Sequence, residues 1–452
     1  MNNSVTTPTA RYKPSRFNLV SWDDKTGQRR LLIYNTMTSA FVRLAQPAAD
    51  RVSLLLKSGT PAAADAIIGA LATQGVLVPE DLDELLLVDS MERYYKQRRD
   101  ALQLILMPTE KCNFRCVYCY EDFVKGKMSD EVRSGIVRLV EREAPHLKTL
   151  NVAWFGGEPL SALGVIREVS AELIALCDAN GIEYSSSMTT NGFLLSSGVA
   201  EETLGLRISR YQITLDGTAS SHDQLRVLRN GRGTFDTIVA NLTALRESRH
   251  DFKVRIRVNF TPQVAQEMPG FLAFMGERFG NDPRFSIWFH PVGRWGGPHD
   301  EDIETCDQQS AEELERGFTG AAADSGFPLT SWEQLMRPFG STCYAADPRS
   351  YVIGSDGMVY KCTVALREPK NHVGQLSSDG DLRLREDRMA VWVSSGAQVD
   401  TGCQACAFRP ACHGDACPLA RLQRGGERSC PPIKSNIKKV LPLIAVRAGR
   451  QR

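Results

Sequence analysis

The sequence lacks the features of membrane and secreted proteins. No uninterrupted apolar stretch approaches the length of a membrane span, and the run at residues 440–446 is far too short. The first residues also lack the basic and then apolar order of a signal peptide. We therefore predict a cytoplasmic protein with no membrane partner.

A strong net charge is absent as well. The chain has 54 Lys and Arg against 53 Asp and Glu, a formal net charge of +1. This balance lacks the basic footprint of nucleic-acid-binding proteins, so no nucleic-acid partner is expected. Apolar residues at 42% and charged residues at 24% are typical of a globular protein, and 452 residues are enough for two or three domains.

The N-terminal part of the chain contains no cysteine and is predicted as a separate domain, residues 1–98. Residues 16–22 and 30–34 have the pattern of two strands. Residues 40–56 and 61–74 have helical patterns.

Residues 99–330 alternate between strand-like runs and amphipathic helical segments. The expected strands are residues 102–107, 149–155, 184–190, 210–215, 253–260 and 285–291. Repeated β/α units indicate parallel strands with crossover helices, and such α/β folds place ligand sites at the C-terminal ends of the strands. Residues 331–435 have shorter strands, many turns and most of the remaining cysteines, and residues 436–452 form a basic tail.

Twelve cysteines in a reducing compartment are more typical of metal ligands than of disulfides. Cys112, Cys116 and Cys119 form a CxxxCxxC pattern directly after the expected strand at residues 102–107. Three thiolates hold only three irons of a cubane [4Fe–4S] cluster, whereas a closed electron-transfer cluster takes four. The pattern therefore indicates a cluster with one iron open to a further ligand.

This pattern resembles the signature of the radical S-adenosylmethionine (SAM) superfamily, in which the open iron chelates the amino and carboxylate groups of SAM. Gly156, Gly157, Glu158 and Pro159 resemble the GGEP motif that contacts the SAM amino group. A Gly-Gly-Glu-Pro loop alone is a turn in most proteins, and the cysteine motif upstream favours the functional interpretation here.

Two further segments resemble motifs of the same family. Residues 189–192 match its TNG element, and Thr214 and Asp216 begin a match to its SxDG…HDxxR element. Arg257 and Asn259 share one face of an expected strand and are predicted to face the barrel interior. An internal salt bridge is the alternative for Arg226 and Arg257, because burying a lone charge is costly.

The resemblance implies a partial (β/α)6 barrel that cleaves SAM reductively to methionine and a 5′-deoxyadenosyl radical, which abstracts hydrogen from a substrate. The protein binds, orients and excludes water, and the cofactor carries the chemistry. No catalytic acid or base is identified. The residues that it implies as SAM contacts are Tyr118, Gly156, Gly157, Glu158, Pro159, Asn191, Thr214, Asp216, Arg226 and Asn259.

The later cysteines resemble the SPASM domain, which holds two auxiliary [4Fe–4S] clusters in peptide-modifying radical SAM enzymes. The resemblance implies one cluster on Cys343, Cys362 and Cys417, and another on Cys403, Cys406, Cys412 and Cys430, for three clusters in all. Cys412 and Cys417 are one residue further apart than is usual in that family. The first set contains only three cysteines. Its fourth ligand is left open between Cys306, a non-cysteine group and a substrate. Zinc is the alternative metal for such thiolate sites.

We expect an enzyme that modifies a ribosomally made precursor peptide by a crosslink, a thioether or a related oxidation. The N-terminal domain resembles a winged-helix module that binds a leader peptide, and an external donor such as flavodoxin or ferredoxin would supply electrons. A sulfatase-type formylglycine-forming enzyme is the first alternative, although those enzymes have Asp where this chain has Thr363, directly after Cys362. A metal-stapled peptide-binding protein without catalysis is the second.

Overall fold

The computed structural model describes residues 11–24, 29–59, 62–63, 65–297 and 300–448. The chain divides into two compact units. Unit 1 comprises the described residues of Met1–Gln97, Thr330–Cys343 and Ser394–Arg452, and unit 2 comprises those of Arg98–Leu329 and Tyr344–Val393. In the described part of the chain, no helix is long and apolar enough to cross a membrane.

Unit 2 is built on a ten-stranded sheet with the strand order β14-β13-β11-β10-β9-β7-β15-β16-β17-β18. Its parallel strands are β7 (Ala101–Leu106), β9 (Thr149–Trp154), β10 (Glu183–Thr190), β11 (Ile208–Thr214), β13 (Lys253–Phe260) and β14 (Phe285–Pro291). They neighbour one another in chain order, and all of their pairings are parallel. The expected α/β fold with a partial barrel is confirmed.

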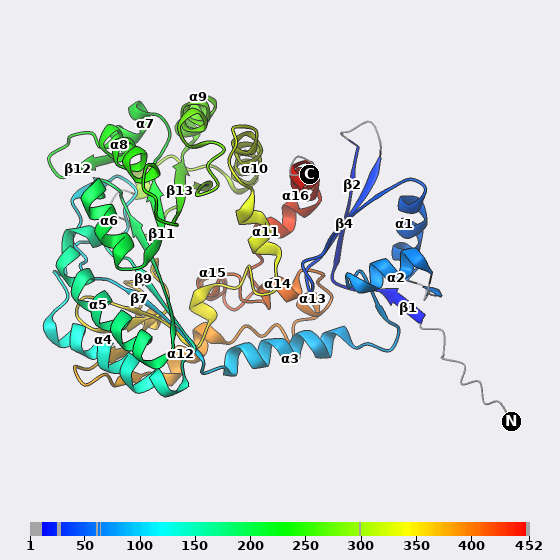
Figure 1. The fold of residues 1–452 in the computed structure, drawn as a ribbon, viewed down its shortest axis with the longest axis horizontal. Helices are drawn as coiled ribbons and strands as arrows, with labels where there is room; N and C mark the ends of the chain where they lie inside the picture. The colour runs from blue at the N-terminus through cyan, green and yellow to red at the C-terminus, as the bar shows by residue number, and fades with distance from the viewer. Residues whose placement is uncertain (1–10, 25–28, 60–61, 64, 298–299, 449–452) are drawn as a thin grey trace. The chain divides into compact units, whose positions relative to one another are not determined.

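Helices alternate with these strands and cover the outer face of the sheet (Figure 1). They are α4 (Asp130–Glu143), α5 (Leu163–Asn180), α6 (Ser197–Gly205), α7 (Ala219–Leu225), α8 (Phe235–Arg246), α9 (Pro262–Phe279) and α10 (Gln308–Asp324). Side-chain caps fix several of their starts: Ser129 accepts from the backbone N–H of Val132, and Thr261 from that of Val264. On the strands, the residues that face these helices are apolar and fully buried, such as Val254 and Ile256.

The sheet continues beyond β7 into residues that follow Tyr344. These strands are β15 (Ser350–Ile353), β16 (Met358–Tyr360), β17 (His372–Leu376) and β18 (Leu382–Leu384), followed by α12 (Glu386–Val393). β15 pairs in parallel with β7, and the other pairings are antiparallel. Ile105 and Met107 pack with Val352 and Tyr360 in one apolar cluster, so this extension shares a core with the barrel.

Unit 1 contains an antiparallel sheet of β2 (Asn18–Asp23), β3 (Arg30–Asn35) and β4 (Phe41–Ala45), followed by α1 (Ala48–Ser58) and α2 (Ala66–Thr73). A second small sheet contains β1 (Arg11–Pro14), β5 (Ala62–Ala63) and β6 (Leu77–Pro79). The sequence predicts a helix from residue 40. This prediction is wrong for Phe41–Ala45, which form the strand β4 and pair with the hairpin strand β3. The helix begins only after Pro47, at Ala48.

The remaining elements of unit 1 are mostly short helices. They are α3 (Glu84–Gln97), α11 (Thr330–Met336), α13 (Thr401–Gln404), α14 (Arg409–Cys412), α15 (Pro418–Gln423) and α16 (Ile433–Ala448). Helix α16 packs on β2, where the Ser21 hydroxyl donates to the carbonyl oxygen of Lys438 at 2.8 Å. Residues 449–452 of the predicted basic tail lie outside the described residues.

Candidate active site

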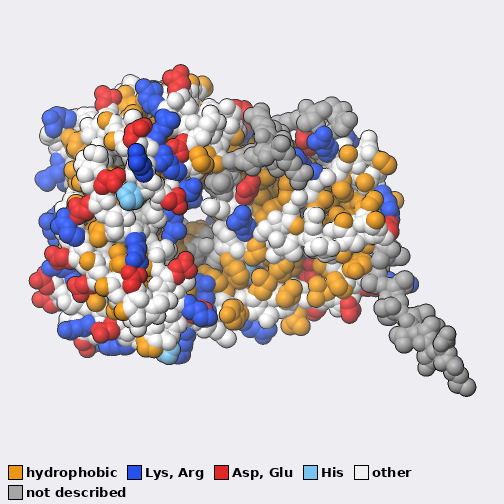
Figure 2. All heavy atoms as spheres, in the orientation of Figure 1, with side chains coloured by type: hydrophobic (Ala, Val, Ile, Leu, Met, Phe, Trp, Pro, Cys, Tyr) orange, Lys and Arg blue, Asp and Glu red, His pale blue; other side chains and the backbone are white. Residues whose placement is uncertain are grey.

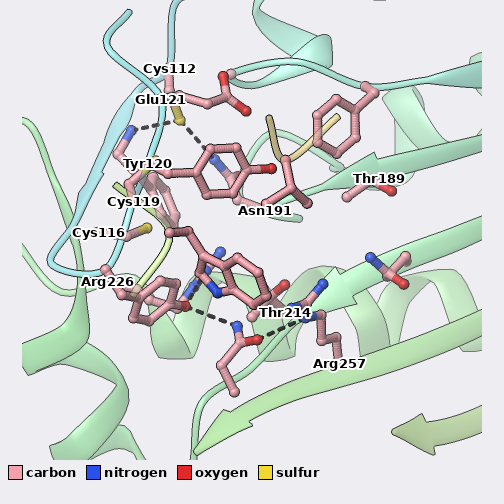
Figure 3. Close-up of a pocket in the computed structure, with 18 of the residues that line it drawn as sticks. Cys112, Cys116, Cys119, Tyr120, Glu121, Thr189, Asn191, Thr214, Arg226 and Arg257 are labelled. Carbon is pink, nitrogen blue, oxygen red and sulfur yellow. Dashed lines mark hydrogen bonds between the residues drawn. The ribbon is translucent and has the colours of Figure 1, made fainter. Parts of the chain in front are cut away.

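The first three cysteines lie on the loop that follows β7, at the C-terminal ends of the parallel strands. Cys112, Cys116 and Cys119 all line one cavity of about 300 Å³. Figure 3 shows them on one side of this cavity, with Thr214 and Arg257 on strands across from them. The spacing predicted from the sequence therefore corresponds to a set of thiols that face one space.

A short strand pair holds this loop in place. β8 (Phe114–Cys116) pairs with β12 (Arg226–Leu228), and the register sets Arg226 opposite Cys116. Arg226 is buried, and its charge lies near the Cys116 thiol, where it counteracts the rise in pKa that burial causes. A fixed cation beside this cysteine favours the thiolate form that binds metal.

The two glycines after β9 allow backbone to pack on backbone. A Cβ atom on Gly157 would lie 2.4 Å from the carbonyl oxygen of Lys111, and one on Gly156 would lie 2.4 Å from that of Thr109. Gly156 also has φ of +110°, which favours glycine. The backbone N–H of Glu158 donates to the carbonyl oxygen of Lys111 at 3.0 Å. The motif thus fixes the segment directly before Cys112.

The Glu158 side chain connects two strand ends. It is fully buried, and its carboxylate accepts from the Thr190 hydroxyl at 2.7 Å and from the backbone N–H groups of Asn191 and Leu160 at 2.8 and 3.0 Å. Burial raises the pKa of Glu158, and these donors counteract the rise. Neither Glu158 nor Pro159 is among the described residues that line the cavity, whereas Gly156, Gly157 and Asn191 line it. Glu158 therefore positions the GGEP and TNG segments against each other.

A buried polar network surrounds the hydroxyl of Tyr118. Asp216 is fully buried, and its carboxylate accepts from the Tyr118 hydroxyl and from the backbone N–H of Asn259 at 2.7 Å. The same hydroxyl accepts from Arg226 at 2.7 Å and from the Asn259 side chain at 3.1 Å. Burial raises the pKa of Asp216, and Arg226 and Tyr118 counteract it. The network joins the cysteine loop to β11, β12 and β13.

Two polar residues of the HDxxR segment have structural roles. The His222 Nδ1 accepts from the backbone N–H of Asp216 at 3.1 Å, and burial holds the pKa of His222 well below its usual value, so the ring is neutral. Asp223 accepts from the backbone N–H groups of Thr234 and Phe235 at 2.7 and 3.0 Å, at the start of α8. These contacts explain why the segment folds back against β11.

The cavity fits a thiolate-held cluster and a polar ligand on three observations. All three cysteines line it, and burial raises the pKa of Cys119 to about 12, so a bound metal is needed to make it a thiolate. Arg226 Nε and Glu121 Oε2 are buried without a hydrogen-bond partner, so the site offers an unused donor and an unused acceptor. Among the described residues, no group of three His, Cys, Asp or Glu is arranged around a single metal ion.

Several cavity residues were absent from the predicted site. Gln212, His290 and Trp295 line it, and so do Glu121 and Arg257. The alternation of inward and outward side chains along β11, β13 and β14 could have identified Gln212, Arg257 and His290, because each of them lies on the inner face of its strand. Glu121 and Trp295 lie on loops, where periodicity gives no signal.

Four of the later cysteines come together in unit 1. Cys403 lies on α13 and Cys412 on α14, and Cys406 lies between these helices. Burial raises the pKa of Cys412 to about 12, and Cys406, Cys403 and Cys430 add to the rise, which they do only from nearby. Lys434 Nζ lies 3.5 Å from the Cys430 sulfur. This is the set that the resemblance assigns to one auxiliary cluster.

The other three predicted ligands belong to different units. Cys343 and Cys417 lie in unit 1, where the backbone N–H of Cys343 donates to the carbonyl oxygen of Asp415 at 2.9 Å. Cys362 lies in unit 2 and is buried, with its N–H donating to Asn371 Oδ1 at 2.9 Å. The spare cysteines are Cys177, fully buried in α5, and Cys306, partly exposed.

Comparison with protein families identifies the barrel region. Residues 106–274 match the family model of the radical SAM superfamily. This stretch runs from the end of β7 into α9 and contains Cys112, Cys116 and Cys119 together with the Tyr118 network.

Comparison with individual proteins agrees. The chain is 25% identical over 346 residues to a serine-type anaerobic sulfatase-maturating enzyme of Klebsiella aerogenes, which covers 71% of this chain and 80% of that protein. It is 27% identical over 310 residues to a GTP 3′,8-cyclase of Xanthomonas campestris, covering 63% and 84%. The solved structure of native anSMEcpe with bound AdoMet and the Cp18Cys peptide has a similar fold, with a TM-score of 0.54, 17% identity and coverage of 77% and 99%. Residues 106–274 are therefore a radical SAM domain, and the protein is an enzyme.

Proposed function

We propose that the protein is a peptide maturase, which uses radical SAM chemistry to modify a precursor peptide. Cys112, Cys116 and Cys119 would hold a [4Fe–4S] cluster, and the cavity beside them would receive SAM. With one electron from an external donor, the bound cluster and SAM would supply the radical chemistry that removes hydrogen from the substrate. All three cysteines line one cavity together with residues of the GGEP and TNG segments, and this is the observation that supports the proposal.

The chain's own residues bind and orient the ligands. Tyr118 is fixed by Asp216, Arg226 and Asn259, so the loop that carries the cysteines is preorganised. Arg226 presents a cation and an unused Nε–H close to Cys116, where the carboxylate of SAM would be bound. Asn191 and Thr214 present polar groups to the same cavity.

A peptide substrate is supported by the related fold of anSMEcpe, which binds the Cp18Cys peptide. Unit 1 supplies a small sheet in which β2 and β4 each pair only with β3 among the described residues. A leader peptide would add a strand at such an edge. The proposal further includes two auxiliary clusters on the later cysteines, a flavodoxin or ferredoxin as donor, and a cytoplasmic location, because thiolate clusters need reducing surroundings.

The test of this function is reductive SAM cleavage. Anaerobically reconstituted protein is mixed with SAM and dithionite, and 5′-deoxyadenosine is measured by chromatography and mass spectrometry. We expect 5′-deoxyadenosine from the wild type and none from Cys116→Ala. Protein that contains iron clusters but forms no 5′-deoxyadenosine contradicts the proposal, and protein that contains only zinc favours the non-catalytic alternative.

Formylglycine formation is the second candidate, because the Klebsiella aerogenes relative is a sulfatase-maturating enzyme. The residue after Cys362 weighs against it. Thr363 has no carboxylate, and it is held by Tyr344, with the two hydroxyls 2.8 Å apart. Incubation with a synthetic sulfatase peptide that contains Ser or Cys separates the candidates, since only this second activity converts that residue to an aldehyde.

A further inference from the structure

The inner face of the barrel carries a stripe of cations. On β13, Val254 and Ile256 are fully buried towards the helices, so the alternate residues Arg255 and Arg257 face the inside. The parallel register sets Gln212 of β11 level with Arg255, and Thr214 level with Arg257. Arg210 and Lys253 are paired at the start of the same two strands, which extends the stripe.

The two guanidinium groups on β13 lack an acidic partner. Among the described residues, no Asp or Glu forms an ion pair with Arg255 or Arg257. Arg257 Nε donates to Asn259 Oδ1 at 2.7 Å, and the guanidinium carbons of Arg255 and Arg257 lie 5.7 and 5.6 Å from the ring centre of Trp288. Burial lowers the pKa of Arg257, so desolvating its charge has a cost, whereas Arg255 is more exposed and does not line the cavity. An internal salt bridge, the alternative given for Arg257, is not formed.

Arg226 provides the contrast. It lies 4.0 Å from Asp216 and donates to Tyr118, so its charge is balanced inside the protein. Arg257 lines the same cavity, and its hydrogen bond to Asn259 links it to Tyr118 of the cysteine loop only indirectly. A carboxylate held at the cysteines therefore meets Arg226 first, and the charge of Arg257 is left for a second anion.

We propose that Arg257, supported by Arg255 and Trp288, binds a carboxylate of the substrate peptide inside the barrel. This inference rests on the proposed peptide-maturase function and adds a substrate class to it. A guanidinium offers two parallel N–H donors to a carboxylate, and an aromatic face beside it keeps its plane fixed. The carboxylate belongs to an Asp or Glu side chain near the modified residue or to the C-terminus of the peptide, and both sources have the same chemistry.

The test measures peptide preference and SAM binding separately. Reconstituted protein with SAM and no reductant is titrated with fluorescent octapeptide mixtures in which one position is fixed as Asp or Glu, or as Asn or Gln. Each mixture is made with a free and with an amidated C-terminus, and fluorescence anisotropy reports binding. The variants are Arg257→Gln, Arg255→Gln and Arg257→Lys, and Arg383→Gln is the control because Arg383 lies on β18 with its side chain 72% exposed.

We expect the wild type and the control to bind carboxylate-bearing mixtures about tenfold more tightly than the matched amides, a preference that salt weakens. Arg257→Gln removes the preference, Arg255→Gln reduces it, and Arg257→Lys keeps part of it because the charge remains. SAM affinity stays within about twofold in Arg255→Gln and in the control, and in the Arg257 variants it changes less than the carboxylate preference does. A preference that follows the fixed position assigns the site to a side chain, and one that follows the free C-terminus assigns it to the peptide end.

Two results overturn the inference: the wild type binds both kinds of mixture equally, or Arg257→Gln keeps the full preference. If that variant keeps the preference and binds SAM more weakly, Arg257 is assigned to SAM. Circular dichroism and iron content confirm that each variant is folded and loaded. Wild-type protein that binds no SAM contradicts the proposed function itself, and the separate SAM titration detects this.

Discussion

The Cys112 site lies within unit 2, and the Cys403 site lies within unit 1. The two sites are built in different ways. Around Cys112, contacts come from distant parts of the chain: Glu158 reaches Thr190, and Tyr118 reaches Asp216 and Asn259, all at the ends of regular strands. Around Cys403 and Cys412, the cysteines lie on helices of four residues, and the distant contacts come from turns and from the Arg409 side chain, which reaches Asp89, and not from the ends of regular strands. The fold shapes the first site, whereas the second needs its metal to hold it together.

The two units also differ in the large apolar side chains that they expose. Large hydrophobic side chains that are exposed in unit 1 include Leu54, Leu86, Tyr94 and Val399. Figure 2 shows many hydrophobic side chains on this face of unit 1, while the visible face of unit 2 is mostly polar and charged. A surface of this kind is typical of a part that binds a partner, as the proposed leader-binding role requires.

Replacing one cysteine ligand in each site tests this difference most directly. Cys116→Ala should lower SAM cleavage by about a thousandfold or more, because it opens the site that holds the catalytic cluster. Cys412→Ala should retain SAM cleavage and lose peptide modification. Assays of 5′-deoxyadenosine and of peptide mass measure the two steps, and Cys177→Ala on α5 is the control for loss of a thiol outside every predicted ligand set.

Removing all metal should affect the two units unequally. In apo protein, we expect amide hydrogen exchange in residues 400–430 to rise by about a hundredfold or more, because only short helices remain there. The strands β9, β10 and β11 should keep their protection, since their core is apolar and independent of metal. Exchange followed by mass spectrometry checks this, and equal loss of protection in both regions would contradict the contrast.

A single substitution tests how far the first site is preorganised. In Asp216→Asn, an N–H group replaces one acceptor oxygen and Arg226 loses its counter-charge. We expect SAM affinity to fall about tenfold and the free energy of unfolding to fall by about 1–3 kcal/mol. Asp223→Asn is the matched control, because an amide oxygen still accepts from Thr234 and Phe235 at the start of α8. Calorimetric SAM titration separates the two variants.

The smallest predicted effect concerns the second site. Burial alone would lower the pKa of Lys434, but the thiols of Cys406 and Cys430 raise it, so the ammonium stays charged beside them. Lys434→Met should make the reduction potential of a cluster there more negative by about tens of millivolts, because a nearby cation favours the reduced form. Lys439→Met on the same helix is the control, and potentiometric titration followed by electron paramagnetic resonance gives the values. An equal shift in both variants would exclude a specific role.

Much of the barrel was predictable because its signals are local. The strand runs at residues 149–155 and 253–260 match β9 and β13 closely, since alternating burial requires alternating sequence. The N-terminal hairpin was harder: Phe41 to Ala45 pairs with β3, and only that pairing distinguishes it from the start of a helix. Strand β15 was equally hidden, because it joins β7 across almost the whole barrel sequence.

The site shows the same division. The motifs predicted which segments meet, but they did not predict that Glu158 and Asp216 would be used inside the protein rather than on the cavity wall. The alternation of residues along the strand predicted that Arg257 faces inwards. Its lack of an acidic partner could not be predicted, because it depends on the side chains of all the surrounding strands. Such properties arise from the assembled fold and carry no local pattern.

Unit 1 is assembled from three separate segments of the chain, and this has a consequence for biosynthesis. Its strands β2 to β4 are made before the barrel, but helix α16, which packs on β2, is made after it. The barrel, by contrast, draws its parallel strands from one continuous stretch and can form while translation continues. The Cys112 loop is thus available for iron loading before Cys430 exists, and a stalled or truncated chain would leave the face of β2 that α16 covers open to aggregation.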